Sequence, residues 1–349
     1  MQRANLASSH CRWSERSRFA SVNEIELNHK AELAPAGPES IASAAQILRG
    51  RGLVAFPTET VYGLGADATS DEAVAGIYAA KGRPGFNPLI AHVPDLASAQ
   101  IHGAFNAHAI ALAEAFWPGP LTLVVPVQPD CKVSLLARAG LDTLALRAPD
   151  HAVAQALLRA LGGPVAAPSA NRSGRVSPTT AAHVLADLGE RIDMIIDGGA
   201  CEVGVESTIV SCLDGDVRLL RPGGISREAI EAVLGRAAPV ADHADKASSP
   251  LAPGMLASHY APRAQVRMNA AHVGPGEAVL DFASQLQNHP GLRLDLSPNG
   301  NLREAAANLF AYLRQLDAPD VGSIAVAPIP MSGLGYAIND RLNRAAAPR

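Results

Sequence analysis

Hydrophobic residues repeat with two different spacings along the chain, one typical of helices and one typical of buried strands. Apolar residues three and four positions apart predict helices at residues 41 to 48, 70 to 82, 106 to 116, 150 to 161 and 178 to 188. Short apolar runs predict strands at residues 53 to 56, 121 to 127, 144 to 147, 165 to 167, 194 to 196, 208 to 211 and 217 to 220. Because these elements alternate, we expect a mixed α/β domain over residues 38 to 235.

A second, smaller domain is predicted at the carboxyl end. Residues 236 to 264 are rich in Ser, Pro and Gly without regular spacing, which predicts a linker. Beyond it the pattern predicts strands at residues 278 to 282, 292 to 296 and 323 to 327, with a helix at 301 to 316. Residues 265 to 349 are therefore expected to form a small α/β domain. Residues 1 to 37 lack such a pattern and are expected to be a disordered extension.

The composition is that of a globular protein with a slightly acidic balance. The 349 residues are 48% hydrophobic and carry a formal net charge of −4, which argues against a surface that binds nucleic acid or an anionic membrane throughout. No stretch approaches the roughly 20 consecutive apolar residues of a membrane helix. The four cysteines form no C-x-x-C pair, so neither a disulfide framework nor a zinc site is predicted. We expect a cytoplasmic protein without membrane contact.

The first segment suited to chemistry is PTETVYGLG, residues 57 to 65, which leaves a buried strand and ends in two closely spaced glycines. It gathers hydroxyls, a carboxylate and a phenol at the carboxyl end of a strand, where α/β sheets place their ligands. The same hydroxyls could instead satisfy the backbone of a turn. Both interpretations stay open at this point.

The second segment is Lys81-Gly-Arg83, followed by NPLIAH at residues 87 to 92. A polyphosphate needs paired cations when no P-loop is present, and the chain contains no G-x-x-x-x-G-K-[ST] motif. Two cations at the end of a helix also offset its dipole, which is an equally good explanation. A histidine on an apolar strand, such as His92, is more often a hydrogen-bonded core residue than a catalyst.

The third segment is PSANRSGRVSPT, residues 168 to 179. Ser177 before Pro178 predicts a helix start, with serine as the N-cap and proline at the first helical position. The amino terminus of a helix also binds anions, and the preceding loop carries Ser169 and Asn171. A phosphate or carboxylate ligand is therefore a second interpretation of this segment.

The fourth segment comprises ESTIV, residues 206 to 210, and LRPG, residues 220 to 223, which mean little separately. They gain weight from the distribution of positive charge. Within or beside the four segments lie Lys81, Arg83, Arg147, Arg172, Arg175 and Arg221. Cations gathered in the motifs of an acidic chain favour a small anionic ligand over a long nucleic-acid track.

Taken together, these strings resemble a known family. PTETVYGLG, KGRP followed by NPLIAH, FWPGPLT, SANRSGRVSPT, ESTIV and LRPG occur in the order found in YrdC-type threonylcarbamoyl-AMP synthases. The linker PGMLASHYAP and the domain beyond it resemble the longer form of that family. The resemblance implies a twisted mixed sheet with a concave ligand-binding face, and a small C-terminal α/β domain with a parallel sheet. Two features depart from the pattern: the amino-terminal extension, and Ala91 in place of a bulkier aliphatic residue.

The resemblance implies conversion of L-threonine, bicarbonate and ATP into threonylcarbamoyl-AMP and pyrophosphate, with Mg²⁺ on the phosphates and no metal ligand from protein side chains. It implies no catalytic side chain, because positioning and charge stabilisation suffice for this nucleotidyl transfer. The threonine contacts correspond to Thr60, His92, Arg147, Ala167 and Ser207. The ATP contacts correspond to Lys81, Arg83, Asn87, Thr143, Ser169, Asn171, Ser177, Arg221 and Tyr260.

The resemblance also implies partners. The product is expected to serve N6-threonylcarbamoyladenosine formation at position 37 of tRNA through downstream transferase machinery, and a contact with tRNA itself is allowed. Linker residues 253 to 262 are expected to fold over the nucleotide; the alternative is that Met255 and Tyr260 only attach the linker to the surface of the first domain. Two other interpretations are a module that binds RNA without catalysis, which the acidic balance disfavours, and a carbamoyl-transfer enzyme using carbamoyl phosphate. The extra metal-binding and acylphosphatase-like segments of the latter are absent from this sequence.

Overall fold

The computed structural model describes residues 30–85, 87–213, 215–240, 259–287 and 291–348. Residues 1–29 of the expected extension and residues 241–258 of the expected linker lie outside this description. Regular structure begins earlier than the sequence predicts, because strand β1 (Glu32–Pro35) pairs in parallel with β8 (Met194–Asp197). The expectation of a disordered segment up to residue 37 is therefore wrong for these four residues. An edge strand this short is stabilised by pairing with its neighbour in the sheet. Its local sequence pattern therefore does not predict it.

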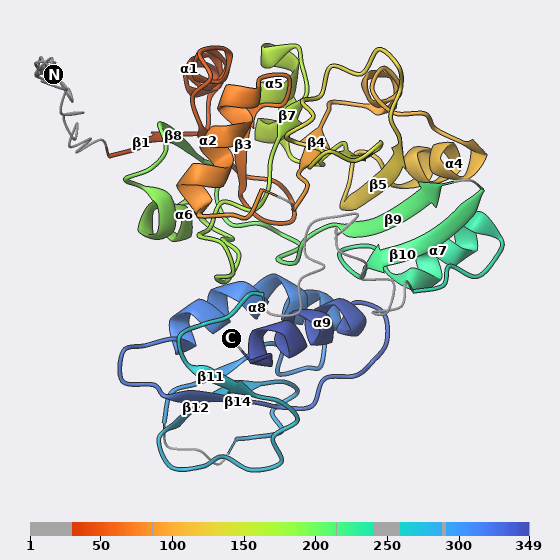
Figure 1. The fold of residues 1–349 in the computed structure, drawn as a ribbon. Coiled ribbons are helices and arrows are strands. Elements are labelled where there is room, and N and C mark those ends of the chain that lie inside the picture. The colour runs from red at the N-terminus through yellow and green to blue at the C-terminus, as the bar shows by residue number, and fades with distance from the viewer. Residues whose placement is uncertain (1–29, 86, 214, 241–258, 288–290, 349) are drawn as a thin grey trace, which may run out of the picture.

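Within the described residues, the first domain contains one ten-stranded mixed sheet, ordered β1-β8-β2-β3-β7-β4-β6-β5-β9-β10 (Figure 1). The other strands are β2 (Val54–Phe56), β3 (Gly63–Asp67), β4 (Ile90–His92), β5 (Leu121–Pro126), β6 (Thr143–Arg147), β7 (Val165–Ala166), β9 (Thr208–Leu213) and β10 (Asp216–Arg221). Parallel pairs such as β4–β6 and β5–β9 occur beside antiparallel pairs such as β5–β6 and β9–β10. This arrangement confirms the predicted mixed sheet.

Helices cover the two faces of this sheet unequally. They are α1 (Pro38–Arg49), α2 (Asp71–Lys81), α3 (Leu96–Gln100), α4 (Ala107–Phe116), α5 (Ala152–Leu161), α6 (Ala181–Leu188) and α7 (Arg227–Leu234). On one face α2, α4, α6 and α7 share a core with Leu64 and Leu146. On the other, α1 and α5 pack together over Phe56. The part of that face around β4, β5, β6 and β9 carries only a small apolar cluster that includes Ile90, which leaves room for a ligand.

The predicted helix start at Ser177 and Pro178 is wrong. Helix α6 begins at Ala181, and its cap is Thr180, whose hydroxyl accepts a hydrogen bond from a main-chain amide of the first turn. The hydroxyl of Ser177 is instead fully buried and donates to the carboxylate of Glu206 at 2.6 Å. A tertiary partner has thus replaced the local capping role.

The C-terminal domain confirms the predicted parallel sheet. Its strands are β11 (Gln265–Arg267), β12 (Glu277–Asp281), β13 (Arg293–Asp295) and β14 (Ser323–Val326), and they pair in parallel in the order β11-β14-β12-β13. Helices α8 (Leu302–Leu316) and α9 (Gly335–Ala346) lie between this sheet and the first domain (Figure 1). None of the helices in the described part of the chain is long and apolar enough to span a membrane.

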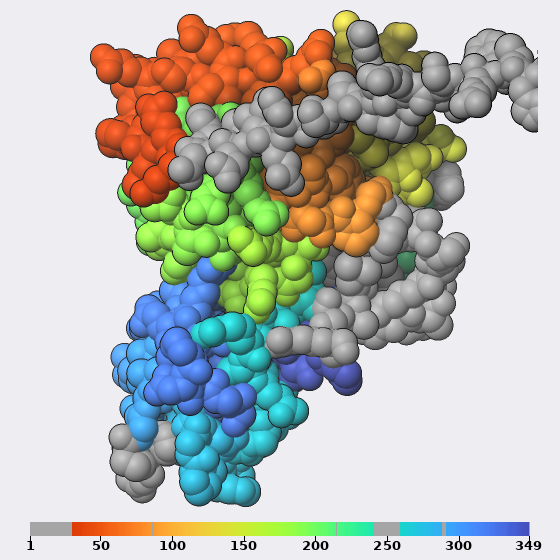
Figure 2. All heavy atoms as spheres, turned by 60° about the vertical axis from the view of Figure 1, so that its left-hand side comes forward, coloured from red at the N-terminus to blue at the C-terminus, as the bar shows by residue number. Residues whose placement is uncertain are grey.

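The two domains share buried apolar contacts. Val61, Val176 and Val205 of the first domain belong to the same buried cluster as Leu309 and Phe310 of α8. In Figure 2 the blue C-terminal domain lies directly against the green segments of the first domain. Their relative position is therefore set by side-chain packing in addition to the covalent linker.

Candidate functional site

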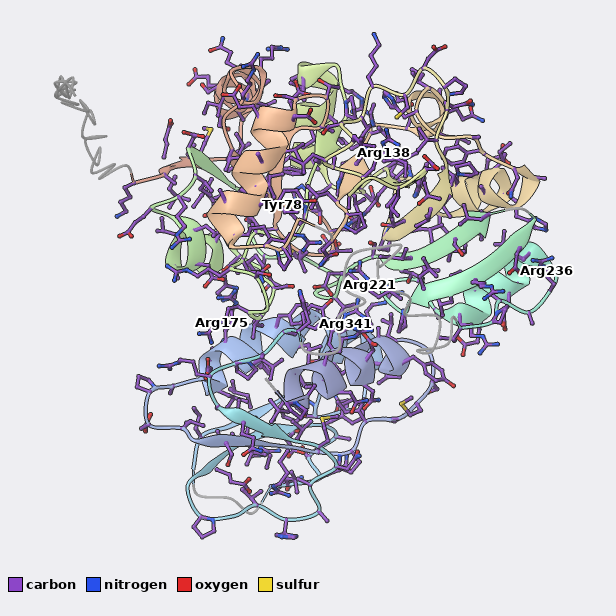
Figure 3. The ribbon with its side chains drawn as sticks, viewed as in Figure 1. Tyr78, Arg138, Arg175, Arg221, Arg236 and Arg341 are labelled. Atoms are coloured by element: carbon purple, nitrogen blue, oxygen red, sulfur yellow. The ribbon has the colours of Figure 1, made fainter. Side chains whose placement is uncertain are left out.

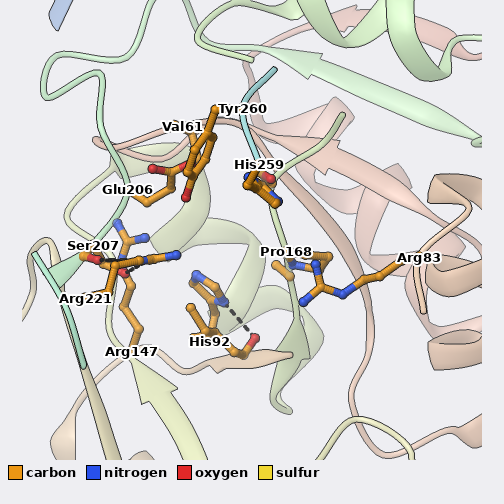
Figure 4. Close-up of a pocket in the computed structure, with 13 residues that line it drawn as sticks. Val61, Arg83, His92, Arg147, Pro168, Glu206, Ser207, Arg221, His259 and Tyr260 are labelled. Atoms are coloured by element: carbon orange, nitrogen blue, oxygen red, sulfur yellow. Dashed lines mark hydrogen bonds between the residues drawn. The ribbon is translucent and has the colours of Figure 1, made fainter. Parts of the chain in front are cut away.

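A pocket opens on the part of the sheet that the helices leave uncovered (Figure 4). It is lined by Val61, Arg83, Ile90, His92, Arg147, Ala167, Pro168, Ser169, Glu206, Ser207, Arg221, His259 and Tyr260. Its volume is about 50 Å³, far below the ~300–1,000 Å³ of most small-molecule sites. His259 and Tyr260, from the end of the linker, lie over the strands and occupy part of this space. The space left among the described side chains is therefore smaller than most ligands need.

Strand register brings His92 and Arg147 together. β4 pairs in parallel with β6, and His92 lies directly opposite Arg147. Because side chains alternate along a strand, both point to the open face, as Ile90 does. Burial and the neighbouring charge of Arg147 lower the pKa of His92 to about 3, and its Nδ1 lies 3.2 Å from the carbonyl oxygen of Ile90. The imidazole is thus neutral at physiological pH and can offer hydrogen bonds but no positive charge.

Arg147 is held by the first motif. Its Nη2 donates to Glu59 Oε1 at 2.6 Å, and its Nε donates to the carbonyl of Gly119 at 3.3 Å. The other Glu59 oxygen accepts the amide hydrogen of Asp150 at 3.1 Å. The neighbouring Thr60 does not line the pocket, and its hydroxyl is 2.8 Å from that of Thr58. The carboxylate in PTETVYGLG therefore fixes the cation, which the sequence alone did not suggest.

Arg221 and Ser207 join the two parts of the fourth segment. Arg221 donates from Nε and Nη2 to the carbonyl of Ser207, at 3.2 and 2.9 Å, and from Nη2 to its hydroxyl at 3.2 Å. The Ser207 hydroxyl also lies 2.7 Å from that of Thr122. Gly223 makes this approach possible, because a Cβ there would lie 2.4 Å from the carbonyl oxygen of Glu206. The glycine of LRPG is thus needed for close backbone contact.

Glu206 lies at the centre of a buried polar network. It accepts hydrogen bonds from Ser177 at 2.6 Å and from Arg341 of helix α9 at 2.9 Å. Burial alone would raise the pKa of Glu206, but the charges of Arg341 and Arg221 and the bond from Ser177 lower it to about 2. The pocket therefore contains a permanent carboxylate among arginines.

The cations of the second segment have different surroundings. Arg83 lines the pocket and donates to the carbonyl of Pro88 at 3.1 Å, and burial lowers its pKa to about 10. Lys81 does not line it, and its ammonium donates to the carbonyls of Ser169 and Asn171 at 2.6 and 2.5 Å. Burial, followed by the charge of Arg83, holds the pKa of Lys81 well below its usual range. Lys81 therefore shapes the loop of the third segment in this arrangement.

The linker enters the site through two aromatic residues. Tyr260 is buried, stacks on Phe310 with ring centres 5.5 Å apart, and lies 5.5 Å from the guanidinium carbon of Arg341. His259 packs edge-on against Tyr260, and burial lowers the pKa of His259 to about 3. Of the predicted cover, residues 253 to 258 lie outside the described residues.

The structure brings eight of the fourteen sequence-predicted residues to the pocket wall. They are His92, Arg147, Ala167, Ser207, Arg83, Ser169, Arg221 and Tyr260. The other six do not line the pocket: Thr60, Lys81, Asn87, Thr143, Asn171 and Ser177. Three atoms of this second group, Asn87 Oδ1, Thr143 Oγ1 and Asn171 Oδ1, are buried without a hydrogen-bond partner in the described structure.

Five lining residues were not predicted: Val61, Ile90, Pro168, Glu206 and His259. Ile90 could have been predicted, because it lies two residues before His92 on the same strand and therefore on the same face of the sheet. The other four had no local signal beyond their place in the motifs.

The described residues contain no group of three or more His, Cys, Asp or Glu side chains able to hold a metal ion.

Comparison with known proteins gives matches over both domains. The Sua5/YciO/YrdC family model, described as "Telomere recombination", matches residues 46–223. A second model, "Threonylcarbamoyl-AMP synthase, C-terminal domain", matches residues 225–347. The threonylcarbamoyl-AMP synthase of Bacillus subtilis is 44% identical over 342 residues, covering 91% of this chain and 96% of that protein.

A more distant relative and a solved structure agree with these matches. The threonylcarbamoyl-AMP synthase of Schizosaccharomyces pombe is 39% identical over 362 residues, covering 88% of each chain. The crystal structure of Pyrococcus abyssi Sua5 complexed with L-threonine superposes with a TM-score of 0.82 at 37% identity. That superposition covers 90% of this chain and 97% of the other.

Proposed function

The chain belongs to the Sua5/YciO/YrdC family and carries the C-terminal domain of its threonylcarbamoyl-AMP synthases, and on this premise we propose that its pocket makes threonylcarbamoyl-AMP from L-threonine, bicarbonate and ATP. The observation that carries the proposal is that one pocket is lined by residues predicted to contact threonine and by residues predicted to contact ATP. The first are His92, Arg147 and Ser207, and the second include Arg83 and Arg221. The relative solved with L-threonine supports threonine as a substrate.

The reaction needs two bonds to form in sequence. The amine of threonine attacks bicarbonate to give a carbamate, with loss of water. A carbamate oxygen then attacks the α-phosphorus of ATP, and the bond to pyrophosphate breaks. No protein group becomes covalently attached, so the residues act by holding the reactants in line and by offsetting negative charge.

The threonine half of the site is assigned as follows. Arg147 binds the carboxylate, because a guanidinium matches its two oxygens. Neutral His92 and the Ser207 hydroxyl supply hydrogen bonds, and the backbone at Ala167 and the side chain of Thr60 complete this half. The fixed position of Arg147, held by Glu59 and the Gly119 carbonyl, supports this role.

The ATP half is assigned to cations and unpaired polar atoms. Arg83 and Arg221 offset the phosphate charge, with Ser169 and Tyr260 beside them. A second group of residues would contact ATP directly or through the four residues just named. This group comprises Lys81, Asn87, Thr143, Asn171 and Ser177. Support comes from the buried oxygens of Asn87 and Thr143, since a polar atom without a partner is costly unless a ligand satisfies it.

Magnesium is proposed to arrive as part of the Mg²⁺–ATP substrate. Glu206 is the single carboxylate residue among those lining the pocket, and its oxygens already accept hydrogen bonds from Ser177 and Arg341. The described protein groups thus fit a metal carried by phosphate oxygens and water better than a resident ion.

The product is proposed to be the threonylcarbamoyl donor for N6-threonylcarbamoyladenosine at position 37 of tRNA. An acyl-adenylate is an activated group, so a transferase must take it up before water does, and a direct contact with tRNA would shorten that path. The reaction is assigned to the cytoplasm, where ATP and tRNA are available. The free state of Cys131, Cys201 and Cys212 agrees with a reducing compartment.

The deciding experiment measures pyrophosphate release from Mg²⁺–ATP by the full chain. We expect release only when L-threonine and bicarbonate are both present, and recovery of threonylcarbamoyl-AMP by mass spectrometry. Equal release with either substrate omitted would mean that the pocket only hydrolyses ATP. RNA binding that does not depend on threonine or ATP, without pyrophosphate release, would instead favour a module that binds RNA without catalysis.

A further inference from the structure

Arg341, on helix α9 of the C-terminal domain, reaches across the domain boundary into the first domain (Figure 3). Its side chain is 0% exposed. Nε donates to Glu206 at 2.9 Å, and Nη1 donates to the carbonyl of Pro222 at 2.5 Å and to Asp340 at 2.9 Å. Two of these three acceptors belong to the first domain.

Each residue that Arg341 contacts in the first domain or the linker either is assigned to ATP or directly adjoins a residue that is. Glu206 is the acceptor of the Ser177 hydroxyl. Pro222 follows Arg221 directly, so the position of its carbonyl also sets the backbone of that arginine. The ring of Tyr260 lies 5.5 Å from the guanidinium carbon. One side chain of the C-terminal domain therefore meets ESTIV, LRPG and the linker at once.

Such a buried ionic contact adds little net stability to a domain interface. A buried ion pair must offset the loss of hydration of both charges, and an apolar pair of similar size often joins surfaces more stably. Nη2 of Arg341 is moreover buried without a hydrogen-bond partner among the described residues. The apolar cluster that contains Val61 and Val205 together with Leu309 of α8 already joins the domains. The chemistry of Arg341 therefore fits a role in orienting charged and aromatic groups.

We propose that Arg341 is a positioning residue for the nucleotide half of the pocket, acting through Glu206, the Pro222 carbonyl and Tyr260. The C-terminal domain then contributes to ATP binding through this guanidinium without touching the substrate. The inference rests on the proposed function, because it assumes that Mg²⁺–ATP binds beside Ser177 and Arg221. It predicts that disturbing Arg341 weakens ATP binding more than threonine binding.

The test compares Arg341→Lys with Arg293→Lys in the full chain. Lysine keeps a positive charge for Glu206 but cannot donate from separate nitrogens to Glu206 and Pro222 at once. Arg293→Lys is the matched control, because Arg293 pairs with the buried Asp281 at 2.6 Å inside the C-terminal domain and does not line the pocket. Calorimetry of Mg²⁺–ATP and, separately, of L-threonine gives both affinities.

We expect Arg341→Lys to lose about tenfold or more in ATP affinity, since residues of one buried hydrogen-bond network are energetically coupled, with threonine affinity within about twofold of the parent. Arg293→Lys should bind both ligands like the parent. A second variant, Arg341→Met combined with Glu206→Gln, avoids an unpaired buried carboxylate and should show the same selective loss.

Unchanged ATP affinity in both Arg341 variants, or an equal loss in Arg293→Lys, would overturn the proposal. Retained threonine binding reports that a variant is folded, so a selective loss cannot come from unfolding. Failure of the parent chain itself to bind Mg²⁺–ATP would instead contradict the proposed function, which separates the two outcomes.

Discussion

Arg147 Nη2 donates to Glu59 Oε1 at 2.6 Å, and both side chains are almost fully buried, at 5% and 8% exposure. The two residues are 88 positions apart in the sequence. Their ion pair joins the strand that carries the proposed threonine cation to the PTETVYGLG motif. Its consequence is that a change at Arg147 has two effects, one on the ligand and one on the carboxylate left behind.

The first prediction separates those effects. Arg147→Ala should lower threonine affinity about tenfold or more, because a charge-assisted contact is lost, and should leave ATP affinity nearly intact. It should also lower the free energy of unfolding by about 3–5 kcal/mol, since Glu59 stays buried without its partner. Adding Glu59→Gln should recover much of that stability without recovering threonine affinity. Calorimetry and urea unfolding measure the two quantities, and a selective loss of ATP affinity would reverse the assignment of Arg147.

The second prediction concerns acid. The pKa values of His92 and His259 are lowered by burial from 6.5 to about 3, so below pH 6.5 the unfolded chain binds more protons than the folded one. Stability is therefore unaffected by these groups above pH 6.5, falls as the pH drops, and reaches its full loss near pH 3. Each histidine contributes a slope of about 1.4 kcal/mol per pH unit inside that window.

The measurement is the free energy of unfolding against pH for the parent and for His259→Gln. The variant should show a slope shallower by about 1.4 kcal/mol per pH unit between pH 4 and 6. His272→Gln is the control, because His272 is exposed and its replacement should leave the profile unchanged. Parallel profiles for the parent and His259→Gln would show that burial of His259 does not govern acid sensitivity.

The third prediction concerns Tyr260 as a cover for the nucleotide. Tyr260→Ala should reduce synthesis and speed the release of threonylcarbamoyl-AMP, because water and product exchange more freely when the ring is missing. Tyr260→Phe keeps the stacking on Phe310 and the contact with Arg341, so it should behave like the parent. Product release is followed by rapid filtration. Equal release rates for both variants and the parent would leave the linker as a tether.

The fourth prediction concerns the close approach of the domains at Gly204. A Cβ at Gly204 would lie 2.4 Å from the Cα of Ala307 on helix α8, and its φ is 72°. Gly199 has φ 86° and open space around it, which makes Gly199→Ala a control for the backbone conformation alone. The control should cost about 1 kcal/mol. Gly204→Ala should cost at least about 2 kcal/mol more, because α8 must move.

Protease digestion and urea unfolding of the two glycine variants test this. Gly204→Ala should be cut between the domains faster than the parent, while Gly199→Ala should not. If the two variants were equally stable and equally resistant, the approach of α8 to Gly204 would not matter for domain contact.

Much of the fold followed from local pattern. Helix α2 begins at the Ser70 cap and ends at Gly82 with φ 60°, as the sequence predicts, because capping and left-handed termini depend on neighbouring residues only. Strand β3 and helix α9 were not predicted. β3 contains two glycines and is held by pairing with β2 and β7, and α9 begins without a side-chain cap. Long-range pairing and packing override weak local preference in both.

The sequence by itself determined which chemistry is present: motif cations, hydroxyls and an imidazole, spaced as in one family. Only the tertiary structure decided which of these groups meet. Ser177 has the local signal of a helix cap, yet Glu206, 29 residues away, takes its hydrogen bond. Glu206 in turn meets Arg341, 135 residues away in the other domain. No periodicity encodes such pairs, because a buried charge takes as its partner whichever opposite charge the packing of the whole chain brings within reach.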